Sequence, residues 1–121
     1  MKSKDYIKKA IRTESVHYRK LTKGNQRLEH AILGMITESG ELADALKKYK
    51  FYNLPLDKVN LIEEIGDVLW YVAIACDELG VDFEKIMDKN IRKLEVRYPE
   101  KFTSEKSKKR NLKKERKELN K

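Results

Sequence analysis

Two long amphipathic stretches without proline constrain the fold more than any other feature of the sequence. They cover residues 26–49 and 57–79, and a short break that contains Pro55 separates them. In the first stretch, apolar side chains recur every three or four residues, which predicts a helix with one apolar face. The second stretch stops at Gly80, a residue type that is common just past a helix end. Because the connection is short, we expect these two helices to be antiparallel neighbours.

A further helix is predicted on each side of this pair. One covers residues 4–21, and the other follows Asp82 and continues to Tyr98, just before Pro99. The chain of 121 residues has room for one core, and its 5 Gly and 2 Pro favour long helices over strands and turns. The sequence therefore predicts an all-α fold, a four-helix-type bundle, as one domain over residues 1–103.

The stretch over residues 57–79 also predicts a partner subunit. Its apolar residues cover almost the whole circumference of the helix, and such a helix must be covered on most sides. Three other helices of one chain leave part of this surface open, so we expect a homo-oligomer. The apolar residues are Ile62, Ile65, Val68, Leu69, Trp70, Val72, Ala73, Ile74 and Cys76.

The positive charge of the chain is concentrated at its C-terminal end. The formal net charge is +8, and residues 104–121 carry nine Lys or Arg against three Glu. Residues 1–103 are nearly balanced and show no basic face, so nucleic acid is not expected as a partner. We expect residues 104–121 to be an additional, helical basic tail. The alternative is an arm that attracts anions or nucleic acid.

The cysteine content and the lack of long apolar runs indicate a soluble protein in a reducing compartment. Cys76 is the single cysteine, and its apolar neighbours predict a buried thiol. The first residues offer no apolar stretch long enough for a signal peptide, and no segment approaches ~20 continuous apolar residues. We therefore expect a cytoplasmic location and no membrane partner.

Four carboxylates are the strongest candidates for chemistry. Glu38 and Glu41 lie three residues apart in the first long stretch, and Glu64 and Asp67 have the same spacing in the second. On a helical projection each pair turns toward the apolar side, where residues at this spacing lie ~5–6 Å apart at Cβ. Gly34, one turn before the first pair, is expected to leave space beside it. The alternative is that all four acids are exposed on charge-rich helices.

Carboxylates from two facing helices would repel one another and resist desolvation, so such a cluster persists when cations lie among them. Oxygen ligands without cysteine or paired histidine indicate a hard cation, Mg²⁺ with Mn²⁺ as the alternative. His17 and His30 are single residues on helices, and we interpret both as structural.

The last predicted helix of the domain supplies the opposite charge. Asn90, Lys93 and Arg97 lie on one side of it, and a Lys and an Arg at four-residue spacing can bind phosphate. The alternative is a pair of solvated cations. Several other residues could line a base pocket, although each is more often core or subunit contact: Met35, Tyr49, Phe51, Tyr52 and Tyr71.

In this order, these residues resemble a known family. Residues 36–43 (ITESGELA) and 63–71 (EEIGDVLWY) are similar to the ExxE…ExxD pattern of the MazG-like all-α nucleoside triphosphate pyrophosphohydrolases. Residues 90–99 (NIRKLEVRYP) resemble the family's Asn-x-x-Lys-x-x-x-Arg-Tyr-Pro stretch. The resemblance covers about residues 6–103. In the tail, Lys109-Arg110-Asn111 stands where many single-domain relatives carry Asn-Arg-Asp, which leaves an active-site role for this segment open.

The resemblance implies an enzyme that cuts nucleoside triphosphates between the α and β phosphates, releasing pyrophosphate and removing non-standard or surplus nucleotides. It also implies a homodimer or a homotetramer. Carried over to this chain, Mg²⁺ would be bound by Glu38, Glu41, Glu64 and Asp67, and phosphates by Lys93 and Arg97, with Asn90 a weaker candidate.

Two other interpretations stay open at this point. A dUTPase-like activity or that of a phosphoribosyl-ATP pyrophosphatase uses the same helical framework. A non-catalytic helical module would instead bind nucleic acid or a protein through residues 104–121. The residues do not determine the preferred base, the sugar or the choice between dimer and tetramer.

Overall fold

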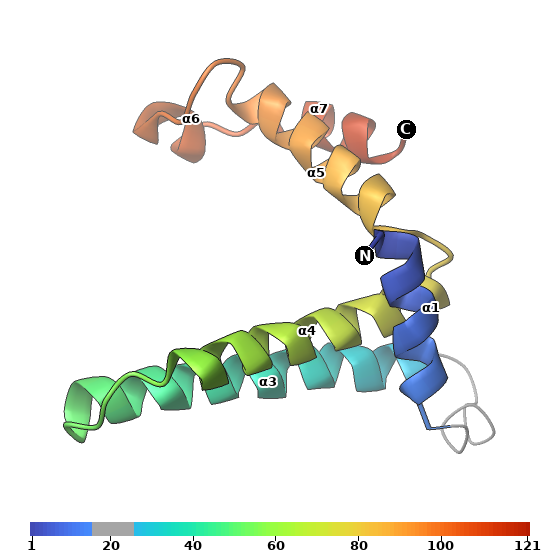
Figure 1. Cartoon of the computed structure of the whole chain (residues 1–121). Coiled ribbons are helices and arrows are strands. Elements are labelled where there is room, and N and C mark those ends of the chain that lie inside the picture. Colours follow the sequence, from blue (N-terminus) through green and yellow to red (C-terminus); the bar gives the residue numbers. More distant parts are fainter. Residues whose placement is uncertain (16–25) are drawn as a thin grey trace. The chain divides into compact units, whose positions relative to one another are not determined.

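The structure, a computed structural model, describes residues 1–15 and 26–121 and is entirely helical in its regular secondary structure there (Figure 1). The predicted all-α fold class is confirmed. No helix within these described ranges combines the length and apolarity needed to cross a membrane. The chain forms two compact units, Met1–Asp82 and Phe83–Lys121. The helices are α1 (Ser3–Thr13), α3 (Gln26–Phe51), α4 (Lys58–Glu78), α5 (Phe83–Arg97), α6 (Ser104–Lys108) and α7 (Leu112–Leu119).

In the first unit, α3 and α4 lie side by side as a long antiparallel hairpin (Figure 1). Asp57 caps α4, because its carboxylate accepts hydrogen bonds from the backbone amides of Val59 and Asn60, both at 3.0 Å. Beyond the other end of α4, Gly80 has a φ of +63°, in the left-handed region that favours glycine. Both long helices therefore begin and end within a few residues of the predicted positions.

The core of the first unit lies where α1, α3 and α4 meet. Ala31 and Ile74 are fully buried and Ala75 is nearly so. Cys76 is buried as predicted, and burial raises the pKa of its thiol. Side chains from all three helices complete this core: Ile11, Leu28, Met35 and Trp70.

Arg27, near the start of α3, is the centre of a buried network of charges. Its guanidinium donates to both oxygens of Glu14 at 2.7 and 2.8 Å, and the Glu14 side chain is only 1% exposed. It also donates to Asp77 at 2.7 Å and to Glu78 at 3.1 Å. These bonds raise the pKa of Arg27, with Glu14 contributing most. We call these four residues the Arg27 network; it joins the ends of α1 and α4 to the start of α3.

Two local predictions are wrong. The first helix ends at Thr13, and Glu14 is extended, because its carboxylate pairs with Arg27 outside the helix; residues 16–21 lie outside the described residues. Gly34 leaves no space beside the acids. A Cβ at this position would lie 2.1 Å from the Tyr71 ring, so glycine is needed here to accommodate that ring.

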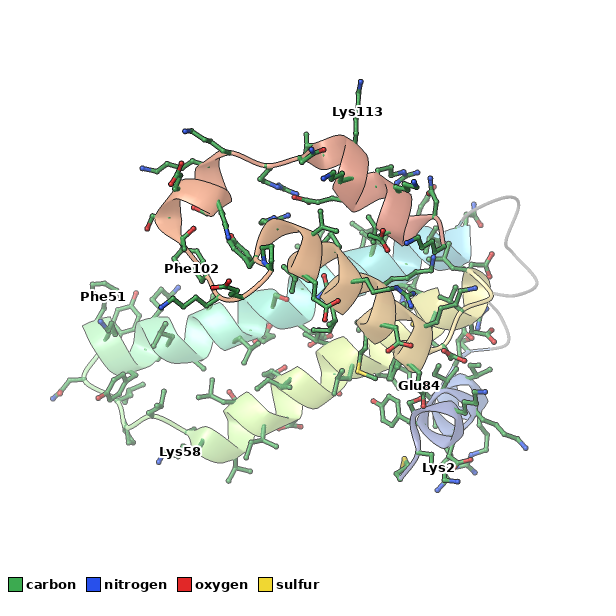
Figure 2. All side chains as sticks on the ribbon, turned by 90° about the horizontal axis from the view of Figure 1, so that it is seen from above. Lys2, Phe51, Lys58, Glu84, Phe102 and Lys113 are labelled. Carbon is green, nitrogen blue, oxygen red and sulfur yellow. The ribbon has the colours of Figure 1, made fainter. Side chains whose placement is uncertain are left out.

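The second unit is built from α5 and the tail. α7 packs against α5 in the opposite direction, since Lys89 donates to the backbone carbonyl of Leu119 while Arg97, later in α5, pairs with Glu115. The tail contains the two short helices α6 and α7. Lys113 extends away from α7 into solvent (Figure 2).

Candidate functional site

Glu38, Glu64 and Asp67 converge between α3 and α4. Each offers one carboxylate oxygen, and these oxygens all lie within 4.8 Å of one another. Glu64 and Asp67 are neighbours because a three-residue spacing places side chains on one face of a helix. Glu64 is 9% exposed, Glu38 is half-buried and Asp67 is exposed. The structure thus brings three of the four predicted carboxylates together, and we call these three the carboxylate cluster.

Crowding of negative charge is visible in the pKa of Glu38. This pKa is raised first by burial and then by the charges of Asp67, Glu64 and Glu41, with a further contribution from a hydrogen bond to Glu64. In the described part of the chain, no Lys or Arg forms an ion pair with any member of the cluster. Among residues 1–15 and 26–121, no basic side chain therefore neutralises this negative charge by direct pairing.

The chemistry of these donors fits a hard divalent cation. Three anionic oxygens within 4.8 Å match the preference of Mg²⁺ and Mn²⁺ for carboxylate ligands. A cation among them would also offset the repulsion between the acids, which adds to the effect of burial on the raised pKa of Glu38. The carboxylate cluster could therefore hold a metal ion.

Glu41, the fourth predicted acid, lies outside this cluster. Its side chain is exposed and lines a pocket of about 360 Å³ near the turn of the hairpin. Its charge still contributes to the raised pKa of Glu38. The same pocket is lined by Lys48 and Asp44, which form an ion pair of 2.6 Å. The ammonium group of Lys48 and the carboxylate of Asp44 therefore share this pocket with Glu41.

Two residues near the cluster were missed from the sequence. Asn60 donates from Nδ2 to Glu64 Oε1 at 2.8 Å. Its position four residues before Glu64 is a helical spacing that could have indicated this contact. Tyr6 lies near Asp67, since the pKa of Tyr6 is raised by burial and then by the charge of Asp67. Tyr6 belongs to α1, so only the packing of α1 on α4 reveals it.

The three predicted phosphate ligands lie on α5 in the second unit. Lys93 donates from Nζ to Asn90 Oδ1 at 2.6 Å, so these two side chains lie together as their spacing suggests. Arg97 is instead engaged by Glu115, to which it donates from Nε and Nη2 at 3.0 and 2.7 Å. Nothing in the sequence pattern indicated that a tail carboxylate pairs with Arg97.

Asn111 stands where the resemblance to the family led us to expect an acid, and it has a structural role. Its side chain accepts a hydrogen bond from the backbone amide of Lys114 at 3.0 Å and so caps α7. Asparagine and aspartate are similarly effective at this position. The departure therefore preserves the start of the helix.

All five candidate base-pocket residues lie on the surface or in packing positions. Met35 packs against the core, and Tyr71 contacts His30 with a centroid distance of 5.5 Å. That contact supports a structural role for His30, whereas His17 lies outside the described residues. The side chains of Tyr49, Phe51 and Tyr52 are exposed.

Comparison with known proteins places this architecture in a family. Residues 26–102 match the MazG nucleotide pyrophosphohydrolase domain. The chain is 32% identical over 79 residues to the gene 37 protein of Mycobacterium phage L5. The matched stretch covers 58% of this chain and 65% of the phage protein. It is 36% identical over 73 residues to the uncharacterized protein YvdC of Bacillus subtilis (strain 168). This matched stretch covers 53% of the chain and 69% of YvdC. No solved structure gives a significant match.

The chain thus spans slightly less than two thirds of the phage relative's length. The family match itself covers more than half of this chain. It includes the carboxylate cluster and the stretch of α5 that carries Asn90, Lys93 and Arg97. The chain therefore belongs to the MazG nucleotide pyrophosphohydrolase family.

Proposed function

We propose that this protein hydrolyses nucleoside triphosphates to nucleoside monophosphates and pyrophosphate with Mg²⁺, and so removes non-standard or surplus nucleotides. The observation that carries the proposal is the meeting of three carboxylates within 4.8 Å, with no Lys or Arg paired to them in the described residues. Membership of the family supplies the reaction class. A cytoplasmic location is part of the same proposal.

Glu38, Glu64 and Asp67 would hold the cation, Mg²⁺ or alternatively Mn²⁺, and we propose Glu41 as a further ligand. When bound, a divalent cation neutralises charge on phosphate oxygens and helps to activate water. Asn60 donates to Glu64 at 2.8 Å and so fixes the orientation of this carboxylate. Because the Glu41 side chain is exposed outside the cluster, we assign it the orientation of the attacking water and the acceptance of its proton. Glu38 is the alternative for this role.

We also propose that Lys93 and Arg97 bind the phosphates of the substrate, with Asn90 as a weaker candidate. The hydrogen bond from Lys93 to Asn90 brings these two side chains together on α5. Arginine suits phosphate because its guanidinium can donate two parallel hydrogen bonds.

A homodimer or a homotetramer is the proposed assembly. Large apolar side chains of the hairpin are exposed in the single chain, among them Ile36 at 63% and Ile62 at 71%. Covering them with a second subunit would remove this apolar surface from water. Further exposed members of this surface are Ile32, Leu33, Ile65 and Leu69.

Two alternative activities use the same helical framework on a different nucleotide: a dUTPase-like activity and that of a phosphoribosyl-ATP pyrophosphatase. The experiment that separates them is pyrophosphate release from a panel of nucleotides at saturating Mg²⁺, repeated in EDTA and after Mg²⁺ is restored. We expect turnover that disappears in EDTA and returns with Mg²⁺. Turnover that persists in EDTA would contradict the proposal.

Matched variants link the activity to the cluster. Glu64→Gln should remove Mg²⁺-dependent turnover, because it replaces a proposed ligand by a neutral amide. Glu63→Gln is the control, since its side chain is exposed and it is not a member of the carboxylate cluster. Equal activity in the two variants would show that the cluster does not perform the chemistry.

A further inference from the structure

Glu115 on α7 is a buried acid that two arginines share. It is 2% exposed. Arg97 of α5 donates to it from Nε and Nη2 at 3.0 and 2.7 Å. Arg110, in the segment before α7, donates from the same pair of atoms at 3.3 and 2.7 Å. One carboxylate thus holds two guanidinium groups from different parts of the second unit.

The charges of this group do not balance. The pKa of Glu115 is lowered to about 2, chiefly by the hydrogen bond from Arg97 and then by that from Arg110. The carboxylate is therefore ionised at neutral pH, and one negative charge faces two positive charges. Among the described residues, no second carboxylate pairs with Arg97 or Arg110. One positive charge remains uncompensated.

The hydrogen bonds leave part of each guanidinium for another partner. Both arginines use Nε and Nη2 for Glu115, so Nη1 of each takes no part in this pairing. Arg97 also interacts with its neighbour Tyr98, whose ring centroid lies 5.8 Å from the guanidinium carbon. Both Nη2 atoms lie 2.7 Å from the same oxygen of Glu115, so they are no farther apart than twice that distance. A phosphate group has several anionic oxygens and can accept from two guanidiniums at this separation.

One arginine already links α5 to α7. Arg97 alone already makes two bonds to Glu115, with 16% of its side chain exposed. The Arg110 side chain is 42% exposed, so this second guanidinium is accessible to solvent. Its presence adds positive charge beside a site that is already neutralised.

We propose that Arg97 and Arg110 form a phosphate-binding site in the second unit, with Glu115 as the positioning residue that holds the two guanidinium groups side by side. The ligand class is the phosphate chain of a nucleotide, and this choice rests on the proposed function. The proposal makes the tail part of the binding machinery and assigns Arg110 a role that the sequence pattern left open.

Four other basic residues of the tail differ from Arg110 in their contacts. Lys109 and Lys121 pair with exposed or half-buried acids close in sequence, Glu105 and Glu118. Lys113 extends into solvent (Figure 2). Arg116 is exposed on α7 and forms no ion pair among the described residues. Arg116 is therefore a matched control for Arg110, because the same substitution removes the same charge from the same segment.

The test is titration calorimetry of the full chain with inorganic tripolyphosphate in EDTA, where bound metal makes no contribution. We expect Arg110→Ala to weaken binding at least tenfold and Arg116→Ala less than twofold, with Arg110→Lys between them. Equal losses in the two alanine variants would overturn the site and indicate a diffuse basic surface. Thermal unfolding of each variant verifies that the chain is folded.

Glu115→Gln separates positioning from simple electrostatics. Removal of a negative charge beside an anion site should by itself tighten binding, whereas loss of the group that holds both arginines should weaken it. We expect weaker binding of tripolyphosphate, and tighter binding would contradict the positioning role. If this variant unfolds, the comparison of Arg110→Ala with Arg116→Ala still tests whether Arg110 belongs to a phosphate-binding site.

Two further measurements distinguish this inference from nucleic-acid binding and from the proposed function. An oligonucleotide that binds more tightly than tripolyphosphate and loses affinity equally in both alanine variants would indicate nucleic-acid binding and overturn the site. Failure to hydrolyse any nucleotide would refute the proposed function, but the tripolyphosphate result would stand. Hydrolysis with an unchanged KM in Arg110→Ala, together with unchanged tripolyphosphate binding, would refute the inference alone.

Discussion

The Arg27 network and the carboxylate cluster are two groups of crowded acids in the first unit. In the first, Glu14, Asp77 and Glu78 surround a guanidinium that donates four hydrogen bonds to them. In the second, three acids bring carboxylate oxygens within 4.8 Å of one another, with no Lys or Arg paired to them in the described chain. Both groups are partly buried.

The difference teaches how to distinguish a structural group of charges from a binding site. Acids that link helices are paired with an arginine or lysine of the same chain, because an unpaired buried charge is strongly destabilising. Acids that lack such a partner keep part of that penalty, which is visible in the raised pKa of Glu38. Such an unpaired group of acids is tolerated where a bound ligand removes this energetic penalty. Here the ligand would be a divalent cation.

The largest expected effect is on the Arg27 network. Arg27→Met should lower the free energy of unfolding by about 3–5 kcal/mol, because it leaves the buried Glu14 without its partner. Chemical denaturation measures this loss. Arg12→Met is the control, since Arg12 is exposed on α1. If both variants lose similar stability, the network is not a structural link and the contrast fails.

The second effect is on turnover. Glu41→Gln should lower kcat by about 100-fold or more, because it removes the proposed acceptor of the water proton. The Mg²⁺ concentration for half-maximal activity should change less than in Glu64→Gln, because Glu41 lies outside the cluster. Steady-state kinetics over a range of Mg²⁺ concentrations separate the two variants. A larger Mg²⁺ shift in Glu41→Gln would instead make Glu41 the principal metal ligand.

The third effect is a gain in stability. The pKa of Glu38 is raised in the folded chain, so the folded state holds this proton more tightly than the unfolded state. The metal-free protein therefore loses stability as pH rises from the ordinary glutamate pKa through the raised one. Glu38→Gln removes this loss and should raise Tm in EDTA at neutral pH. The gain should disappear at a pH below both pKa values, and a lower Tm at neutral pH would refute the interpretation.

The smallest effect concerns α7. The pKa of Glu115 falls from 4.5 to about 2 on folding, so its bonds to Arg97 and Arg110 stabilise the folded state fully above about pH 4.5. This contribution is lost as pH falls from 4.5 toward 2. Circular dichroism should show a small loss of helix in this range, and Glu115→Gln should lack that transition. Identical titrations of the two proteins would contradict the assignment.

The sequence predicted the elements whose signals are local. Helical spacing identified the two long helices, and it placed Glu64 beside Asp67 and both of them toward α3. The resemblance to the MazG family is confirmed by the match over residues 26–102. These features depend on positions three or four residues apart, which any helix brings together.

The rest depends on contacts between distant segments. Arg27 pairs with Glu14 and Asp77 across α1, α3 and α4, and no periodic pattern indicates such a pair. The same holds for Glu115 and Arg97, which lie 18 residues apart in the sequence. The first helix was predicted too long because the pairing of Glu14 with Arg27, which fixes its end, is not visible in a local pattern.

The most direct test of the central claim is the response of thermal unfolding to Mg²⁺. The full chain is unfolded in EDTA and at increasing Mg²⁺, beside the double variant Glu64→Gln/Asp67→Asn. A cation that binds only the folded cluster should raise Tm progressively in the wild type and leave the double variant unchanged. An equal response of the two proteins, or no response of the wild type, would contradict the claim that these acids hold a divalent cation.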